Sequence, residues 1–370
     1  MKSRYISIFT ATAILLILSN PAFAYRQIID LGSLGGSPSY AYSINNSDQI
    51  VGSAYNSSDS ERACLFDSTG GGLNKDLGIL TSRYYTRAYS INDKGQIVGF
   101  ATNPAQPRAC LFDPTGGGAN INLGTLSAYT FSSIAYSINN NGKIVGMCQA
   151  SSGYRQHACL FDSTGGGANV YLGTLGGDWS NAYSINNSNQ IVGYAGNSSG
   201  YSRACLFNSI DAKFNKDLGT LGGNASEAWF INDVGQIIGK ATNNLNYDHA
   251  CLFDSTGNGA NIDLGTLGGL WSQALCVNNY GQIVGTASRS SGGDHACLFD
   301  STGRGNNIDL NALIDPSSGW ILEEAYSINN DGWIVGKGMN SNGERAFLLT
   351  PEPATLLLLG LGGLMLRKRS

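Results

Sequence analysis

Histidine, cysteine and acidic residues are the side chains of this chain that could hold a metal ion or carry out catalysis. His157, His249 and His295 each precede the same Ala-Cys-Leu-Phe block, and six of the eight cysteines occupy its second position. Equivalent positions of successive repeats lie too far apart to share a metal ion or to form a catalytic pair. We therefore expect no metal, no cofactor and no catalytic residue. The adjacent acids Glu323 and Glu324 are more typical of a solvated pair.

The repeated cysteines are expected to be small buried hydrophobic residues, not disulfide partners. They are Cys64, Cys110, Cys159, Cys205, Cys251 and Cys297. Neighbouring copies would exceed the Cα separation of about 7 Å that a disulfide allows. Cys148 is an extra cysteine near Cys159 within one repeat, so a bridge between these two stays open. Cys276 replaces a serine and has no evident mate.

Two kinds of loop resemble ligand sites but lack the residues that such sites need. The segments 67–72 and 162–167 read DSTGGG, without the following Lys-Ser/Thr and helix of a phosphate loop. The Asn-rich segment 45–48 has no acidic residue at the bidentate position of a calcium loop. Both kinds are predicted to be hairpin turns.

These residues are carried by a repeat that occurs seven times. Its Leu-Gly pair begins at Leu31, Leu77, Leu123, Leu172, Leu218, Leu264 and Leu310, in steps of 46 residues with a single step of 49. Each unit holds four strand-like runs, which we letter A (YSIN), B (QIVG), C (ACLF) and D (ending in LG). Only Gly, Asn and Asp end the turn between runs A and B, as a turn with positive φ requires. Four strands per unit is the content of one propeller blade.

The two ends of the repeat region complement each other. The stretch from Tyr25 matches only run D, and the stretch 345–350, where the repeats end, matches only run C. The first strand can therefore pair with the last three and join the ends. We predict an all-β fold, a seven-bladed β-propeller of four-stranded repeats over residues 25–350, closed by pairing of the N-terminal strand with the last blade. A linear β-solenoid is the less favoured alternative, because it would need atypical capping repeats.

The N-terminal segment 1–24 is predicted to be a secretory signal peptide. Lys2 and Arg4 precede an apolar run over 6–18, and Ala22-Phe23-Ala24 supplies small residues before a cleavage site at Tyr25. An uncleaved membrane anchor is the alternative, although the run is short for a span of about 20 residues.

The C-terminal segment 351–370 has three parts. Pro351, Glu352 and Pro353 are followed by an apolar run over 354–366 and by the basic residues 367–369. This end resembles the PEP-CTERM sorting signal. The resemblance implies recognition of Pro351, Glu352 and Pro353 by exosortase-type sorting machinery, and a place on the cell surface or in the extracellular matrix of a Gram-negative bacterium. A plain tail anchor is the alternative. Contact with the membrane is expected only through the two terminal segments.

The body of the chain is acidic. The whole chain has 22 basic and 26 acidic residues, and the two end segments hold five of the basic residues and one acidic residue, which leaves 17 and 25 for the body. With this balance, and without a cluster of Lys or Arg, binding to nucleic acid is not expected.

The repeats resemble the HAF repeat family of extracellular proteins. The resemblance rests on the His-Ala pairs at His157, His249 and His295, on DLGTLGG from Asp217 and Asp263, and on INDKGQIVG from Ile91. It covers residues 25–350. Arg replaces the His in four units, and Cys replaces the Phe of the family's block in six. The resemblance implies a fold and an extracellular place, but no activity.

Aromatic residues of the D–A connections are the candidate binding residues. They are Tyr40, Tyr85, Tyr129, Trp179, Trp271 and Trp320. The D–A and B–C connections of a blade share one face of a propeller, and aromatic rings amid Ser, Asn and Gly suit carbohydrate. The alternative is that these rings pack between blades.

We therefore expect a non-catalytic surface or matrix module whose face of variable loops contacts exopolysaccharide or a surface protein. One alternative is a propeller enzyme acting on glycans, a lyase or hydrolase, which would need acids, His or Tyr converging at one end of the channel. The other is a purely structural scaffold.

Overall fold

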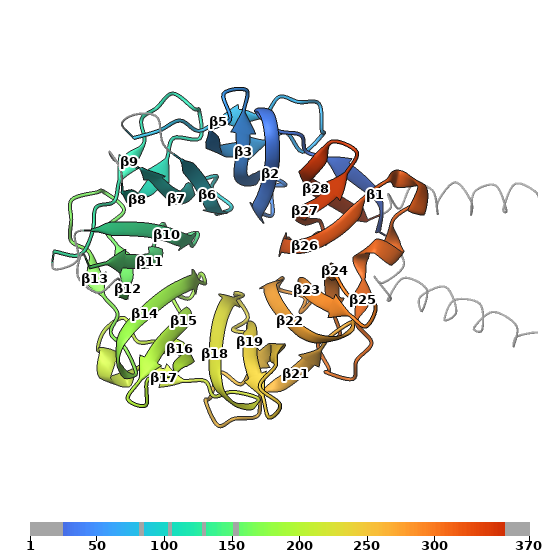
Figure 1. The fold of residues 1–370 in the computed structure, drawn as a ribbon. Helices are drawn as coiled ribbons and strands as arrows, with labels where there is room; N and C mark the ends of the chain where they lie inside the picture. The colour runs from blue at the N-terminus through green and yellow to red at the C-terminus, as the bar shows by residue number, and fades with distance from the viewer. Residues whose placement is uncertain (1–24, 81–84, 103–105, 128–130, 151–154, 352–370) are drawn as a thin grey trace, which may run out of the picture.

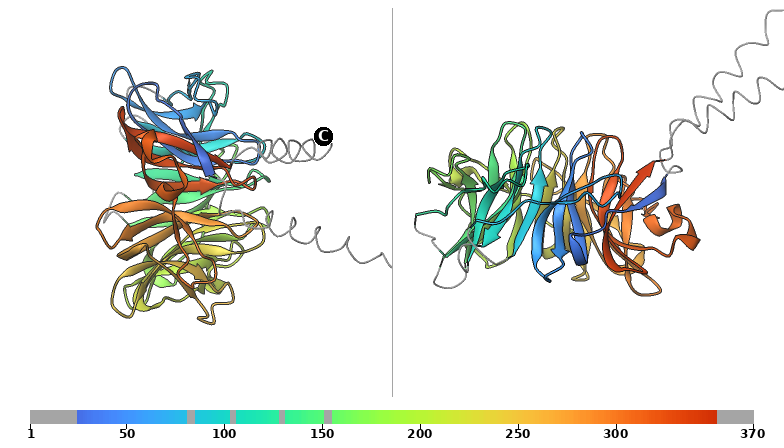
Figure 2. Two further views of the ribbon diagram at one scale, coloured as in Figure 1. Left: turned by 90° about the vertical axis from the view of Figure 1, so that its right-hand side faces the viewer. Right: turned by 90° about the horizontal axis from the view of Figure 1, so that it is seen from above.

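The chain forms a closed ring of seven four-stranded antiparallel sheets (Figure 1). The structure is a computed structural model, and it describes residues 25–80, 85–102, 106–127, 131–150 and 155–351. Side views show a flat ring whose strands run across its thickness (Figure 2). The predicted all-β class and the predicted seven-bladed β-propeller are thus confirmed. The signal peptide predicted for residues 1–24 lies outside the described residues.

We number the sheets as blades 1 to 7. Blade 1 holds β2 (Gly35–Ile44), β3 (Ile50–Asn56), β4 (Glu61–Phe66) and β5 (Lys75–Asp76). Blade 2 holds β6 (Thr86–Ile91), β7 (Ile97–Thr102), β8 (Pro107–Phe112) and β9 (Ile121–Asn122). Blade 3 holds β10 (Ser132–Ile138), β11 (Ile144–Gln149), β12 (Gln156–Phe161) and β13 (Val170–Tyr171). Blade 4 holds β14 (Gly176–Ile185), β15 (Ile191–Asn197), β16 (Ser202–Phe207) and β17 (Lys216–Asp217), with η2 (Ala212–Phe214) before its last strand.

The remaining blades follow the same order. Blade 5 holds β18 (Gly222–Ile231), β19 (Ile237–Asn243), β20 (Asp248–Phe253) and β21 (Ile262–Gly265). Blade 6 holds β22 (Gly268–Val277), β23 (Ile283–Arg289), β24 (Asp294–Phe299) and β25 (Ile308–Asp309). The short helices η3 (Leu310–Leu313) and η4 (Pro316–Ser318) lead to blade 7, which holds β26 (Ile321–Ile328), β27 (Ile334–Asn340), β28 (Gly343–Pro351) and β1 (Tyr25–Asp30).

The first strand of the chain closes the ring. β1 pairs antiparallel with β28, with Ile28 opposite Leu349 and Asp30 opposite Phe347. Figure 1 shows β1, in blue, at the outer edge of the sheet that ends in red. Blade 7 therefore takes its three inner strands from the C-terminal end of the repeat region and its outer strand from the N-terminal end, as the complementary partial repeats predict.

The turn between the first two strands of each blade has the predicted backbone. Its last residue has a positive φ in all seven blades, with values of 58° at Asp48 and 61° at Asn189 where the residue is not glycine. Asn and Asp tolerate this left-handed conformation better than other residues with a side chain. The restriction of this position to Gly, Asn and Asp thus follows from the hairpin geometry.

The hydrophobic core lies between blades. Val51 and Ala63 of blade 1, for example, pack with Ile97 and Cys110 of blade 2 in one buried cluster. The Leu of each Leu-Gly pair is also buried, with Leu77 at 0% exposure. Each blade packs one face on the blade before it and the other face on the blade after it, so the closed ring covers both faces of every blade.

Candidate functional site

The innermost strand of each blade directs one large residue toward the axis of the ring. In all seven blades a fully buried alanine, such as Ala41, packs toward the preceding blade, and a β-bulge lies at the residue that follows it. Because the bulge interrupts the alternation of the strand, the residue after that alanine faces the channel together with the one that follows. These residues are Tyr42, Tyr89, Tyr136, Tyr183, Trp229, Leu275 and Tyr326, and they line a cavity of about 340 Å³. We call this cavity the axial well.

Five tyrosine rings form a continuous wall of the axial well. Ring centroids lie 5.2 Å apart between Tyr326 and Tyr42, 5.5 Å between Tyr42 and Tyr89, 5.5 Å between Tyr89 and Tyr136, and 5.2 Å between Tyr136 and Tyr183. The next residue in the same five blades is serine, which also lines the cavity. This part of the wall thus offers both aromatic carbon and hydroxyl groups.

Blades 5 and 6 break the pattern and make the other side of the well apolar. Trp229 and Phe230 stand where other blades have Tyr and Ser, and Leu275 and Cys276 do so in the next blade. The well therefore has a hydroxyl-bearing side and an apolar side, although the backbone around it is nearly symmetric.

The tyrosines of the well are neutral hydrogen-bonding groups at ordinary pH. Burial raises the pKa of Tyr42 above its usual value of 10.0, and it does the same for Tyr136, Tyr183 and Tyr326. A phenol with a raised pKa donates and accepts hydrogen bonds but is a poor source of phenolate.

The channel end formed by the turns between first and second strands is ringed by asparagines, which line a cavity of about 150 Å³. The side-chain nitrogen of one Asn in each blade donates to the backbone carbonyl of the equivalent Asn in the next blade, as from Asn45 to Asn92 at 2.9 Å and from Asn186 to Asn232 at 3.0 Å. Side-chain oxygens of the following residues accept from backbone N–H groups of the preceding blade, as Asp93 does from Asn46 at 3.0 Å. These groups partner one another, so this end is held by structural contacts.

Toward the face of the D–A and B–C connections, the well is followed by two columns of residues that vary from blade to blade. Their members are directly paired across the first two strands. The pairs are Tyr40 with Ser53, Arg87 with Phe100, Ile134 with Met147, Asn181 with Tyr194, Glu227 with Lys240, Gln273 with Thr286, and Glu324 with Lys337. We call these fourteen residues the variable mouth.

The variability of the mouth contrasts with its neighbours in the same strands. The next position in the first strand is alanine in every blade, and the position before the second column is glycine in every blade. A surface that differs where the scaffold repeats is the expected arrangement of a binding site, since loops and rims carry recognition while the scaffold positions them. This internal comparison is the signal in the sequence that identifies the mouth.

Charged side chains of the mouth form networks with residues that begin the third strand. Arg87 binds Glu61 of the preceding blade through two hydrogen bonds of 2.6 and 3.0 Å, and Ser53 donates to the same carboxylate at 2.8 Å. Lys337 lies 3.0 Å from Glu344 and 3.4 Å from Glu324. The hydroxyl of Tyr40 donates to Glu344 at 2.9 Å, which links blades 1 and 7.

Of the described residues in the predicted aromatic set, only Tyr40 joins the well. Its ring stacks on Tyr42 with centroids 6.0 Å apart. Tyr85 is 58% exposed on the loop face, and Tyr129 lies outside the described residues.

The three predicted tryptophans are half-buried away from the axis. The ring nitrogen of Trp179 donates to Ser202 at 3.2 Å, the backbone N–H of Trp271 donates to Ser288 at 2.9 Å, and Trp320 lies edge-on to Phe347 with centroids 6.3 Å apart. The structure therefore does not bring the predicted set together at one point.

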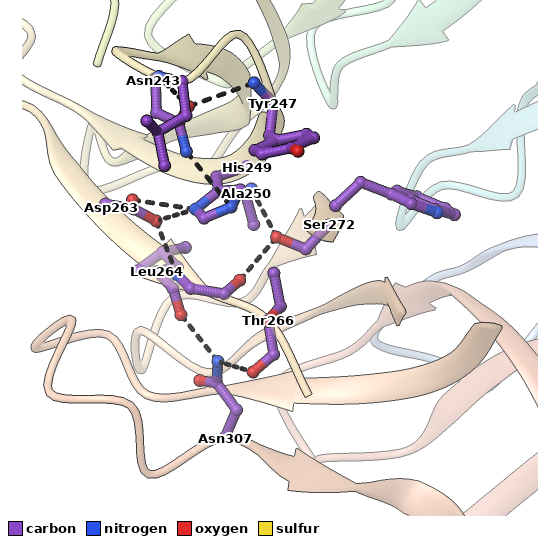
Figure 3. A network of polar contacts seen from close by, with 12 residues as sticks. Asn243, Tyr247, His249, Ala250, Asp263, Leu264, Thr266, Ser272 and Asn307 are labelled. Atoms are coloured by element: carbon purple, nitrogen blue, oxygen red, sulfur yellow. Dashed lines mark hydrogen bonds and ion pairs between the residues drawn. The ribbon is translucent and has the colours of Figure 1, made fainter. Parts of the chain in front are cut away.

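The histidines of the column lie on the third strands of their blades, and Figure 3 shows how one of them, His249, contacts the outer strand. His249 Nδ1 is 2.9 Å from both carboxylate oxygens of Asp263 on the next strand. Burial opposes the charge of Asp263, but the hydrogen bond with His249, the backbone N–H of Gly265 and the charge of His249 together outweigh it and lower the Asp263 pKa. Arg203 pairs with Asp217 at the same position of blade 4, at 3.1 Å. At this position, Arg in blade 4 and His in blade 5 thus make the same contact with an aspartate of the outer strand.

Asparagines from the next blade fasten these outer strands. Asn307 donates to the backbone carbonyls of Leu264 and Thr266 at 2.7 and 3.2 Å, as Figure 3 shows. Among the described residues, no group of three or more His, Cys, Asp or Glu side chains is placed to hold a metal ion.

All eight cysteines are buried free thiols. Burial raises the pKa of the repeated thiols, for example Cys64 and Cys205. Cys148 and Cys159 of blade 3 are both free thiols and are not bridged. The hydrophobic role predicted for the repeated cysteines agrees with their complete burial.

Comparison with known families finds a sorting signal at the C-terminal end. Residues 349–370 match the PEP-CTERM protein-sorting motif. The motif implies recognition by exosortase-type sorting machinery and marks an exported, surface-targeted protein. Pro351 is the last residue of β28, whereas Glu352 and Pro353 lie outside the described residues. No curated protein matches the chain. In the part of the chain that the structure describes, no helix has the length and apolar character needed to cross a membrane.

Proposed function

We propose that this protein is a non-catalytic polysaccharide-binding module of the cell surface or extracellular matrix, and that the axial well and the variable mouth bind the ligand. The observation that carries the proposal is the wall of five contacting tyrosine rings in a cavity of about 340 Å³. The sorting motif supports a place outside the cell, where the protein could meet an extracellular polysaccharide.

The chemistry of the well suits a sugar ring. A pyranose has an apolar C–H face and a rim of hydroxyl groups, and the well has an apolar side at Trp229 and Leu275 and a hydroxyl side at the tyrosines and serines. The high pKa of the buried tyrosines keeps their hydroxyl groups available as donors. The loop-face aromatics Tyr85, Trp179, Trp271 and Trp320 would extend this surface outward.

The proposal includes processing and family. We infer that residues 1–24 are a signal peptide removed before Tyr25, where β1 begins, that the host is a Gram-negative bacterium, and that the repeats belong with the HAF repeats of extracellular proteins. N-terminal sequencing of the exported protein tests the cleavage. A first residue within 1–24 would refute it.

Binding is tested by passing the purified full-length protein over immobilised exopolysaccharide of its host. We expect retention, and at least a tenfold loss of affinity in Tyr136→Leu. Leucine occupies this column naturally at Leu275, so the substitution keeps a side chain that the ring already accommodates. Tyr280→Leu is the control, because Tyr280 is 78% exposed at the turns on the opposite face. No retention, or equal retention of Tyr136→Leu and wild type, contradicts the proposal.

A surface protein is the other partner that the loop face could contact. An enzyme acting on glycans is the second candidate function, and one observation supports it. Glu324 and Glu344 converge on Lys337 beside the tyrosine wall, and a glycan lyase or hydrolase needs such a gathering of acids at one end of the channel. Incubation with the bound polysaccharide decides between them. Release of shorter chains, lost in Glu324→Gln, would favour the enzyme.

A further inference from the structure

We infer that the ligand of the variable mouth is a polysaccharide that carries protonated amino groups, and that such a group binds beside Glu324, Glu344 and Tyr40. This inference rests on the proposed function and adds the charge of the ligand. It comes from the balance of charges around one sector of the mouth, where blades 7 and 1 meet.

The sector has more acid than base. Lys337 is the single cation of this cluster, and three carboxylates surround it: Glu344 at 3.0 Å, Glu324 at 3.4 Å and Glu323 at 3.9 Å. Burial opposes the charge of Lys337, but Glu344 and Glu324 outweigh it and raise the Lys337 pKa. One permanent positive charge is thus shared among three acids, and about two negative charges stay uncompensated.

These acids are linked to the axial well through Tyr40. Glu344 accepts a hydrogen bond from Tyr40, whose ring stacks on Tyr42 with an angle of 5° between the ring planes. Tyr42 and Tyr326 are neighbours in the tyrosine wall. A sugar ring placed against this part of the wall would therefore bring its substituents to Glu344 and Glu324.

The other charged sectors of the mouth do not offset the excess. Glu61 is matched by the bidentate contact with Arg87. Lys240 lies 3.0 Å from Asp248 and 3.9 Å from Glu227, which again is one base with two acids. Three bases in these networks face six acids, and a partly enclosed acidic mouth attracts cations and repels anions.

The aromatic wall adds to this preference. The faces of tyrosine and tryptophan rings attract cations, and they do so more strongly where water is excluded. A protonated amine on a sugar would meet both the uncompensated carboxylates and the edge of an aromatic wall. A polysaccharide that carries uronates would be repelled, because its own carboxylates have the same negative charge as those of the mouth.

The test uses two ligands that differ at the amino group, which carries a positive charge in one and is a neutral amide in the other. The full-length protein is titrated calorimetrically, near neutral pH, with a hexosamine oligomer whose amines are free and with the same oligomer fully N-acetylated. We expect the free-amine oligomer to bind about tenfold more tightly, and this preference to shrink as salt is raised. Glu344→Gln and Glu324→Gln should each reduce the preference severalfold while the N-acetylated oligomer binds as before.

The control is Asp178→Asn, which removes an exposed carboxylate that pairs with Arg155 at the loop face of blade 4. It should leave the preference unchanged. Equal binding of the two oligomers would overturn the inference and leave the proposed function standing, whereas failure of every saccharide to bind would remove both. A simple polyamine that competes with the free-amine oligomer at equal affinity would also overturn it, since the site would then recognise a cation without a sugar.

Discussion

The side-chain nitrogen of Asn329 donates to the backbone carbonyl of Asn45 at 3.3 Å, and this contact completes a circle of hydrogen bonds around the channel. The other six members of the circle join neighbouring blades at 2.9 to 3.0 Å. Within each blade, the side-chain oxygen of the same Asn also accepts a hydrogen bond from a backbone N–H group of its own turn. One residue type thus shapes the hairpin and fastens it to the next blade.

Loss of one Asn of the circle should destabilise the whole ring. Asn186 donates to Asn232 and to Gln190, and it accepts from two backbone N–H groups at 3.1 and 2.9 Å. We expect Asn186→Ala to lower the free energy of unfolding by about 2–4 kcal/mol, because buried partners lose their hydrogen bonds. Urea denaturation measures the change. The exposed Asn258→Ala should stay within about 0.5 kcal/mol of wild type, and an equal effect of both substitutions would contradict the assignment.

The closing blade depends on one large side chain. Phe347 is fully buried where six other units have cysteine, and it packs with Trp320 and the core of blade 7. Phe347→Ala should cost about 3–5 kcal/mol of stability through lost burial and the cavity that is left. Phe214→Ala is the matched control, since Phe214 is 63% exposed. A cost below about 1 kcal/mol for Phe347→Ala would mean that the blade closes without this contact.

The blades and their closure can be predicted from the sequence because their determinants are local. Asp48 and Asn189 take a backbone conformation that few side chains tolerate, so the turn leaves a direct mark on residue type. The pairing of β1 with the last blade is likewise predictable, because the last repeat lacks a fourth strand and the N-terminal stretch matches that strand. Neither the turn nor the closure requires knowledge of how the blades are oriented relative to the axis.

The axial well cannot be predicted in the same way. A β-bulge between Ala41 and Ser43 interrupts the alternation of the strand, so a period of two does not predict that Tyr42 and Ser43 both meet the axis. A tyrosine repeated at one position in five of the seven units resembles a packing residue. Tyr40 reaches the well because it stands two residues before Tyr42 in β2 and stacks on its ring. Trp179 and Trp271 also lie within first strands, but they stand two residues earlier, where the register of the strand shifts.

The thiols should be unreactive in the folded protein. All eight cysteines are buried, and burial raises the pKa of the repeated ones, so little thiolate is accessible. We expect no reaction with a thiol reagent in native protein and eight reactive thiols after unfolding without reductant. A count of six after unfolding would show a bridge, and peptide mapping would then reveal whether Cys148 and Cys159 form it.

The pair Glu61–Arg87 should be coupled more strongly than a surface ion pair. The side chain of Glu61 is 4% exposed, and Arg87 reaches it from the next blade with two hydrogen bonds. A double-mutant cycle with Glu61→Gln and Arg87→Gln should give a coupling energy of about 1–3 kcal/mol, discounted because Arg87 is itself 38% exposed. The exposed pair Arg155–Asp178 serves as control and should give less than about 1 kcal/mol. Equal coupling in the two cycles would contradict the expectation.

Alkaline pH should destabilise the ring through the tyrosines of the well. Burial raises the pKa of Tyr136 above 10.0 in the folded protein, so above that pH the unfolded chain loses the proton while the folded chain keeps it. Stability from this group is complete below the pKa of the unfolded state and is lost as the pH rises. Tyr136→Phe removes one such proton, and the decline in unfolding free energy above pH about 10 should become shallower by about 1.4 kcal/mol per pH unit. Urea titrations from about pH 8 to 11 measure the slope, with the change at neutral pH as the control for altered packing. An unchanged slope would mean that Tyr136 ionises equally in both states.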